Sequence, residues 1–204
     1  MKRITSIVLV LVMMVSLFAI PTSVFAKDIK FLVAESYNDY ITGDSPLGGA
    51  VAGGKTKVVA ETLAVNLRCD ICQIKDMKKR DGIRNRFTST IDAFRESKTE
   101  IYPPTLDLEE YDTIYIGTPT WANNPTPAII TLIDRCDLRG KDIVLFTTTS
   151  TSDGESALEK MEMKVRARGA RVVQQFSVKT KDKSLDALQK DTDRIFMTLD
   201  LALY

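Results

Sequence analysis

Histidine is absent from the 204-residue sequence, tryptophan occurs once and cysteine three times. The absence of histidine excludes a Ser-His-Asp triad, a histidine general base and histidine metal ligands. A strong excess of one charge is also missing, because 28 lysines and arginines stand against 27 aspartates and glutamates. This balance predicts no nucleic-acid partner and no strongly charged target.

A long apolar segment is missing as well, since a helix that spans a bilayer needs about 20 apolar residues. Residues 7–20 form an apolar run with one serine, Lys2-Arg3 precede it, and Val24-Phe25-Ala26 follow it. This arrangement is typical of a secretory signal peptide. We therefore predict that residues 1–26 are cleaved and that residues 27–204 form one exported domain (extracellular, periplasmic or in the cell envelope) without stable membrane insertion. An uncleaved membrane anchor is the alternative.

The three cysteines predict neither a disulfide nor a redox dithiol. Cys69-Asp70-Ile71-Cys72 has the C-x-x-C spacing but follows a predicted helix instead of beginning one. In a strand, three steps of about 3.3 Å place the two Cα atoms about 10 Å apart and on opposite faces, whereas a disulfide needs less than about 7 Å. Cys136, late in a predicted helix, is expected to be a small core residue.

Apolar runs typical of strands alternate with segments of helical periodicity after residue 28. The expected strands are 29–34, 69–74, 113–117, 142–147 and 171–178. The expected helices are 56–67, 90–97, one capped by Asn124 with Pro125 in first position, one begun by the capping box Ser152-Asp153-Gly154-Glu155, and 184–203. Right-handed crossovers between such strands produce a parallel sheet with helices on both faces. The expected fold class is therefore α/β, a doubly wound three-layer sandwich around a five-stranded parallel sheet.

Three loops are candidates for a binding site, because ligands of doubly wound folds bind outside the carboxyl ends of the strands. The first ends in Gly53-Gly54-Lys55-Thr56 at a helix start, where backbone N–H groups and the helix dipole favour a phosphate. The second contains Trp121, which either stacks on a flat ring or only packs the loop. The third, residues 147–154, has more hydroxyls than helix capping requires.

Three segments carry a resemblance to a known family. Residues 111–121 (YDTIYIGTPTW), 137–141 (DLRGK) and 145–150 (LFTTTS) resemble, in order and spacing, flavodoxins and flavodoxin-like FMN oxidoreductases. The resemblance implies strand order 2-1-3-4-5 and an FMN held noncovalently by the three loops, with its phosphate at the first loop and its ring between the other two. The residues that it implies for FMN are Ser36, Gly54, Lys55, Thr56, Thr118, Pro119, Thr120, Trp121, Asn123, Thr148, Thr149, Ser150, Asp153 and Gly154.

The sequence departs from the family pattern at two places. The phosphate loop of the family is a compact hexapeptide, whereas Ser36 through Thr56 is 21 residues long. Closing the longer loop costs only about 1 kcal/mol, so the fold tolerates it. Ser150, Ser152 and Asp153 stand where relatives favour glycine.

A P-loop nucleotide site is the first alternative, since Gly49 through Thr56 satisfies G-x-x-x-x-G-K-T. A P-loop begins directly after its strand, but the first strand is expected to end near Glu35. The acidic residue that holds Mg²⁺ is also missing, because the third strand runs into Gly117 and Thr118 and the fourth into hydroxyl residues. The second alternative is a flavodoxin-fold binding domain that has lost FMN, because a fold does not determine function.

The charge of the predicted mature chain argues against a dedicated electron carrier and leaves room for an oxidoreductase. Removing Lys2 and Arg3 from the 28 basic residues leaves 26 against 27 acidic ones, a formal charge of −1. In the family that this sequence resembles, flavodoxins that serve only as electron carriers are typically strongly acidic. We expect electron transfer with a redox partner protein or FMN-dependent oxidation and reduction of a quinone or NAD(P)H, and no side chain stands out as a catalytic acid or base.

Overall fold

The computed structural model describes residues 29–34, 54–78, 91–93, 95 and 98–199. The elements are β1 (Ile29–Ala34), α2 (Lys55–Leu67), β2 (Asp70–Asp76), β3 (Ile101–Tyr102), β4 (Thr113–Pro119), α4 (Pro127–Arg135), β5 (Asp142–Thr149), α5 (Glu155–Ala167), β6 (Arg171–Lys179) and α6 (Leu185–Phe196). The predicted signal peptide and Ser36 lie outside the described residues. Of the helix expected over 90–97, residues 91–93 are described and are helical.

One mixed sheet forms the centre of the fold, with strand order β3-β2-β1-β4-β5-β6. All neighbouring pairs from β2 to β6 are parallel, whereas β3 pairs antiparallel with β2. The expected α/β class is confirmed. The five expected strands are parallel neighbours in the implied order 2-1-3-4-5, but the sheet is not five-stranded, because β3 adds a sixth, antiparallel strand. The additional strand has only two residues, which is too short to produce a recognisable alternation before Pro103-Pro104.

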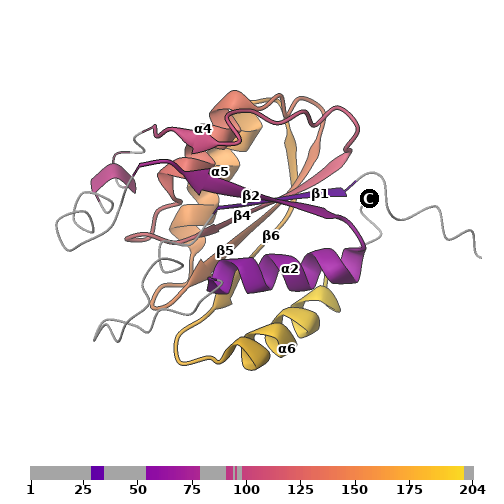
Figure 1. Cartoon of the computed structure of the whole chain (residues 1–204), viewed down its shortest axis with the longest axis vertical. Coiled ribbons are helices and arrows are strands. Elements are labelled where there is room, and N and C mark those ends of the chain that lie inside the picture. Colours follow the sequence, from indigo (N-terminus) through magenta and orange to yellow (C-terminus); the bar gives the residue numbers. More distant parts are fainter. Residues whose placement is uncertain (1–28, 35–53, 79–90, 94, 96–97, 200–204) are drawn as a thin grey trace, which may run out of the picture.

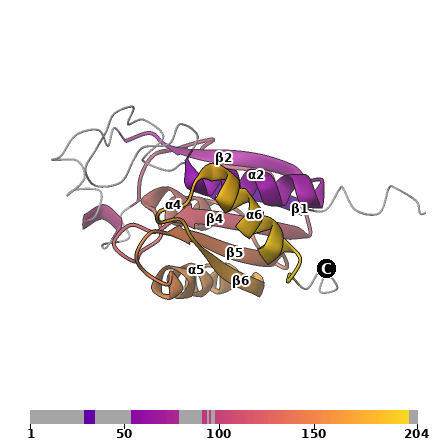
Figure 2. The same ribbon diagram turned by 90° about the horizontal axis from the view of Figure 1, so that it is seen from below.

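Helices cover both faces of the sheet, α4 and α5 one face and α2 and α6 the other (Figure 1, Figure 2). The strands β4 and β5 lie between these layers, and all but one of their residues are buried. Their side chains alternate between two cores: Ile114 and Ile116 face α4 and α5, whereas Tyr115 faces α2 and α6. This burial explains the unbroken apolar runs by which both strands are predicted.

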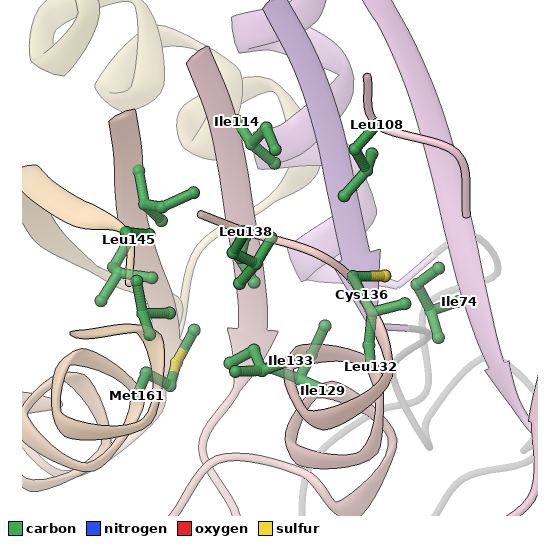
Figure 3. Close-up of a cluster of buried hydrophobic side chains, with 14 of the residues drawn as sticks. Ile74, Leu108, Ile114, Ile129, Leu132, Ile133, Cys136, Leu138, Leu145 and Met161 are labelled. Carbon is green, nitrogen blue, oxygen red and sulfur yellow. The ribbon is translucent and has the colours of Figure 1, made fainter. Parts of the chain in front are cut away.

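The core beneath α4 and α5 includes residues from both helices and from β2, β4 and β5. In Figure 3, Ile129, Leu132 and Ile133 of α4 and Met161 of α5 lie among side chains of the sheet. Cys136 is 1% exposed in this core, which confirms its expected role. Cys72 packs against the same core and Cys69 against the opposite one, so the two lie toward opposite faces of the sheet, as expected.

Two helices begin later than expected. Helix α4 has Thr126 as N-cap and Pro127 in its first turn, because the backbone of Asn124 instead pairs with Trp121. Helix α5 has Gly154 as N-cap, with no side-chain cap hydrogen bond, so the capping-box prediction at Ser152 is wrong. By contrast, α6 begins within one residue of the expected position, after its N-cap Ser184, whose hydroxyl accepts a hydrogen bond from the Ala187 amide at 3.2 Å.

Candidate functional site

The start of α2 faces the carboxyl edge of the sheet. Its N-cap, Gly54, has φ +54° and no side chain, and the first turn contains no acidic residue. The first amide groups of a helix have no partner within the helix, and the helix dipole makes this end positive. The beginning of α2 therefore has the chemistry that an anion requires.

Two side chains attach the start of α2 to distant strand ends. The ammonium of Lys55 donates to the carbonyl of Thr180, just after β6, at 2.6 Å. The hydroxyl of Thr56 lies 2.5 Å from the hydroxyl of Thr148 near the end of β5. The start of α2, where the phosphate is predicted, is thus in contact with the end of β5. Lys55 adds a positive charge there, and its ammonium is held by the Thr180 carbonyl.

The end of β4 is fixed to the start of α4 through Thr118, which is completely buried. Its hydroxyl lies 3.0 Å from that of Thr126 and accepts a hydrogen bond from the Thr126 amide at 3.2 Å. Thr118 therefore organises the loop from within.

Trp121 belongs to a tight hairpin between β4 and α4. Its amide donates to the carbonyl of Asn124 at 2.8 Å, and the amide of Asn124 donates back at 3.0 Å. The two central residues, Ala122 and Asn123, have φ of +48° and +62°, as a two-residue hairpin with the twist of adjacent strands requires. The side chain of Trp121 is half-buried, so part of its surface can meet a ligand.

Asn124 holds this hairpin with its side chain. Its Nδ2 donates to the carbonyl of Ala122 at 2.7 Å, and its Oδ1 accepts a hydrogen bond from the ammonium of Lys160 on α5. Asn124 is 3% exposed, so its amide is satisfied within the protein.

The loop after β5 connects the other two segments. The carbonyl of Thr148 accepts a hydrogen bond from the Thr120 amide at 2.9 Å, in addition to the contact of its hydroxyl with Thr56. The hydroxyl of Thr149 lies 2.7 Å from that of Ser152, which explains why Ser152 does not cap α5. Ser150 is exposed.

Gly154 is required by the packing at the start of α5. Its φ is +86°, and a Cβ atom at this position would lie 2.5 Å from the hydroxyl of Thr147. Asp153 is exposed, and its carboxylate accepts a hydrogen bond from the amide of Glu155 at 3.1 Å.

The structure divides the predicted site residues into two groups. The buried residues, which organise the loops, are Gly54, Thr56, Thr118, Pro119, Thr148, Thr149 and Gly154. The residues with accessible side chains are Lys55, Thr120, Trp121, Asn123, Ser150 and Asp153. A ligand at this edge would therefore meet the second group together with backbone groups of the first.

Residues that sequence reasoning did not assign to the site also support it. The amide of Thr126 donates to the hydroxyl of Thr118, the carbonyl of Thr180 accepts from Lys55, and Lys160 reaches Asn124 from α5. Lys160 is 36 positions from Asn124, and Thr180 is 125 positions from Lys55, so no local pattern signals either contact. Among the described residues, no group of three or more potential ligands could hold a metal ion.

The segment 137–141, which contributes to the family resemblance, lies at the opposite edge of the sheet, before β5. The carboxylate of Asp137 accepts hydrogen bonds from the side chain and amide of Arg139, which lower the pKa of Asp137 to about 2. The amide of Gly140 donates to the carbonyl of Gly169 at 3.0 Å, and the Lys141 ammonium to that of Glu109 at 3.0 Å. This motif is structural.

The sequence model of the flavodoxin family matches residues 49–189, which include all three loops except the beginning of the first. The chain therefore belongs to the flavodoxin family. No curated protein matches it significantly in sequence.

Solved structures show the same fold. A protein from Bacteroides uniformis described as a flavoprotein has 19% identity and a TM-score of 0.63, over 82% of this chain and 99% of its own. Another, from Bacteroides eggerthii, has 17% identity and a TM-score of 0.59, over 83% and 98%. A flavoprotein from Lactobacillus acidophilus, solved in complex with FMN, has 18% identity and a TM-score of 0.54, over 74% and 93%. At these identities the likeness establishes a flavodoxin-like α/β fold.

Proposed function

We propose that this chain is an exported FMN-binding protein that acts in electron transfer or as an FMN-dependent oxidoreductase toward a quinone or NAD(P)H. One observation supports the proposal above the others: Thr148 joins the three loops. Its hydroxyl contacts Thr56 at the start of α2, and its carbonyl accepts a hydrogen bond from Thr120 in the loop that contains Trp121. The segments that the family resemblance implies for one ligand thus form one connected edge.

The residues at this edge fit the chemical parts of FMN. The first turn of α2 offers backbone amides, a positive dipole end and Lys55 to a phosphate, with no acidic residue to repel it. The half-buried indole of Trp121 suits a flat aromatic ring. The exposed Ser150 and the half-buried Thr120, whose hydroxyl also donates to the carbonyl of Thr148 at 3.4 Å, suit its polar rim.

When bound, FMN would supply the redox chemistry, and the protein would hold and orient it. Thr56, Thr118 and Thr148 would keep the loops in place without leaving their internal hydrogen bonds. No acid or base at this edge is proposed as catalytic. The export part of the proposal is supported by the apolar run of residues 7–20 with the basic residues before it. Separately, none of the helices that the structure describes is both apolar enough and long enough to cross a membrane.

The P-loop alternative receives no support from this edge. The ammonium of Lys55 is bound to the carbonyl of Thr180, and β4 and β5 end in Pro119 and Thr149 instead of an acidic residue that could hold Mg²⁺. The family match over residues 49–189 also includes the whole G-x-x-x-x-G-K-T segment.

The visible absorption spectrum of the purified protein tests the proposal. Bands of an oxidised flavin that remain with the protein through gel filtration are expected. A colourless protein that stays colourless after incubation with FMN would favour the alternative, a flavodoxin-fold domain that has lost its cofactor.

Mixing the FMN-loaded protein with NAD(P)H then distinguishes the two proposed activities. For an oxidoreductase, we expect the flavin absorption to disappear with NAD(P)H and to reappear when a quinone is added. Bleaching by a reduced partner protein alone is expected of a carrier.

A further inference from the structure

The ammonium of Lys160 contacts the loop of Trp121 from a different helix. Lys160 lies in the second turn of α5 and donates to Oδ1 of Asn124, the residue that closes the hairpin. The same amide donates through Nδ2 to the carbonyl of Ala122 at 2.7 Å. The side chain of Asn124 is thereby held at both ends.

This position is unfavourable for a cation by itself. Asn124 lies two residues before Thr126, the N-cap of α4, and the positive end of a helix dipole repels an ammonium group. Within the described part of the chain, the hydrogen-bond partner of Lys160 is a neutral amide. Helix stability therefore does not explain the placement of Lys160, and a role in shaping the hairpin does.

The hairpin needs such support because its turn is conformationally demanding. Ala122 has φ +48°, a left-handed conformation that a residue with a Cβ atom adopts at a cost. Asn124 is 3% exposed, so removing Lys160 would leave its Oδ1 without a partner in a nearly buried position. An unsatisfied buried acceptor favours rotation of the amide, which would also release the Ala122 carbonyl.

We propose that Lys160 is a positioning residue for the proposed flavin site, acting through Asn124 to hold Trp121 in the orientation that stacks on the ring. The inference rests on the proposed function for the ligand, but the effect on the hairpin can be observed without it. Trp121 is the only tryptophan in the chain, so intrinsic tryptophan emission reports directly on this loop.

The test compares Lys160→Met, Lys160→Arg and Lys190→Met in the full chain. Lys190 is an exposed lysine of α6 on the opposite face of the sheet and serves as the matched control. In the apo-protein, Lys160→Met should shift the Trp121 emission to the red, and it should weaken FMN binding roughly ten- to hundredfold, as expected for one lost hydrogen bond of a charged donor. Lys160→Arg retains a donor and should restore both values, and Lys190→Met should change neither.

A second measurement asks whether Lys160 acts through Asn124. If it does, adding Lys160→Met to Asn124→Ala should not change emission or FMN affinity further. Unaltered emission and affinity in Lys160→Met, or effects that simply add in the double variant, would overturn the inference. If the parent protein binds no FMN, the proposed function fails, while the emission of the apo variants still decides whether Lys160 positions the hairpin.

Discussion

The hydroxyl oxygens of Thr56 and Thr148 lie 2.5 Å apart, although 92 positions separate the two residues in the chain. The contact joins the first turn of α2 to the end of β5, and both side chains are almost completely buried. A hydrogen bond in this position keeps the proposed phosphate end of the site at a fixed distance from the proposed ring end.

The contact between these two threonines can be tested by removing one hydroxyl or both. Thr56→Val should lower the free energy of unfolding by about 1–3 kcal/mol, because the hydroxyl of Thr148 then loses a buried partner. In Thr56→Val with Thr148→Val both polar groups are gone, and the loss should be smaller than that of Thr56→Val alone. Urea unfolding measures both, with Thr105→Val at an exposed threonine as the control. A double variant that is less stable than either single variant would contradict the assignment.

Gly154 and Gly140 form a matched pair for testing the packing at the start of α5. Both have positive φ, +86° and +72°, but a Cβ atom at Gly154 meets the hydroxyl of Thr147 at 2.5 Å, whereas one at Gly140 meets nothing within 4 Å. Gly140→Ala should cost about 1–2 kcal/mol of unfolding free energy, the backbone strain alone. Gly154→Ala should cost more and also weaken FMN binding. If thermal or urea unfolding shows the same loss of unfolding free energy in both variants, the contact with Thr147 has no effect on stability.

Trp121 and Lys55 distinguish a flavin site from a nucleotide site. Trp121→Ala should weaken FMN binding by about 1–3 kcal/mol, the contribution of an aromatic stack on a base. Lys55→Ala should have a smaller effect, since the amides of α2 can hold a phosphate and the ammonium is engaged with Thr180. Isothermal titration of both variants at one salt concentration provides the comparison. A larger loss of FMN affinity in Lys55→Ala than in Trp121→Ala would favour the P-loop alternative. If Trp121→Ala binds FMN as tightly as the parent protein, Trp121 only packs the loop.

Processing at the amino terminus is a separate prediction. The basic start, the short apolar run and Val24-Phe25-Ala26 predict that exported protein begins at Lys27. Amino-terminal sequencing of protein recovered from the cell exterior or envelope measures this directly. An intact chain that begins at Met1 and remains in the membrane fraction would indicate the uncleaved anchor instead.

The elements that can be predicted from the sequence are those that depend on residues close to one another in the chain. The strands β4 and β5 are recognisable because both of their faces are buried, which produces continuous apolar runs such as Ile114 through Ile116. The three candidate loops follow from the alternation of strands and helices. The start of α6 is predicted to within one residue, because a helix start depends on neighbouring residues such as its N-cap Ser184.

The incorrect predictions arise where distant contacts decide the local structure. Asn124 followed by Pro125 satisfies the rules for a helix start, but Lys160 and Trp121 engage Asn124 in a hairpin, and α4 begins at Pro127. Ser152 satisfies the capping-box rule, but its hydroxyl pairs with Thr149.

Titration of the apo-protein with FMN, monitored by flavin fluorescence and by the emission of Trp121, tests the central claim most directly. We predict that both emissions are quenched together at one FMN per chain, because the indole and the ring stack, and that excess ATP does not reverse the quenching. Unchanged emission of both chromophores over the titration, or tight binding of ATP without any effect of FMN, would contradict the account.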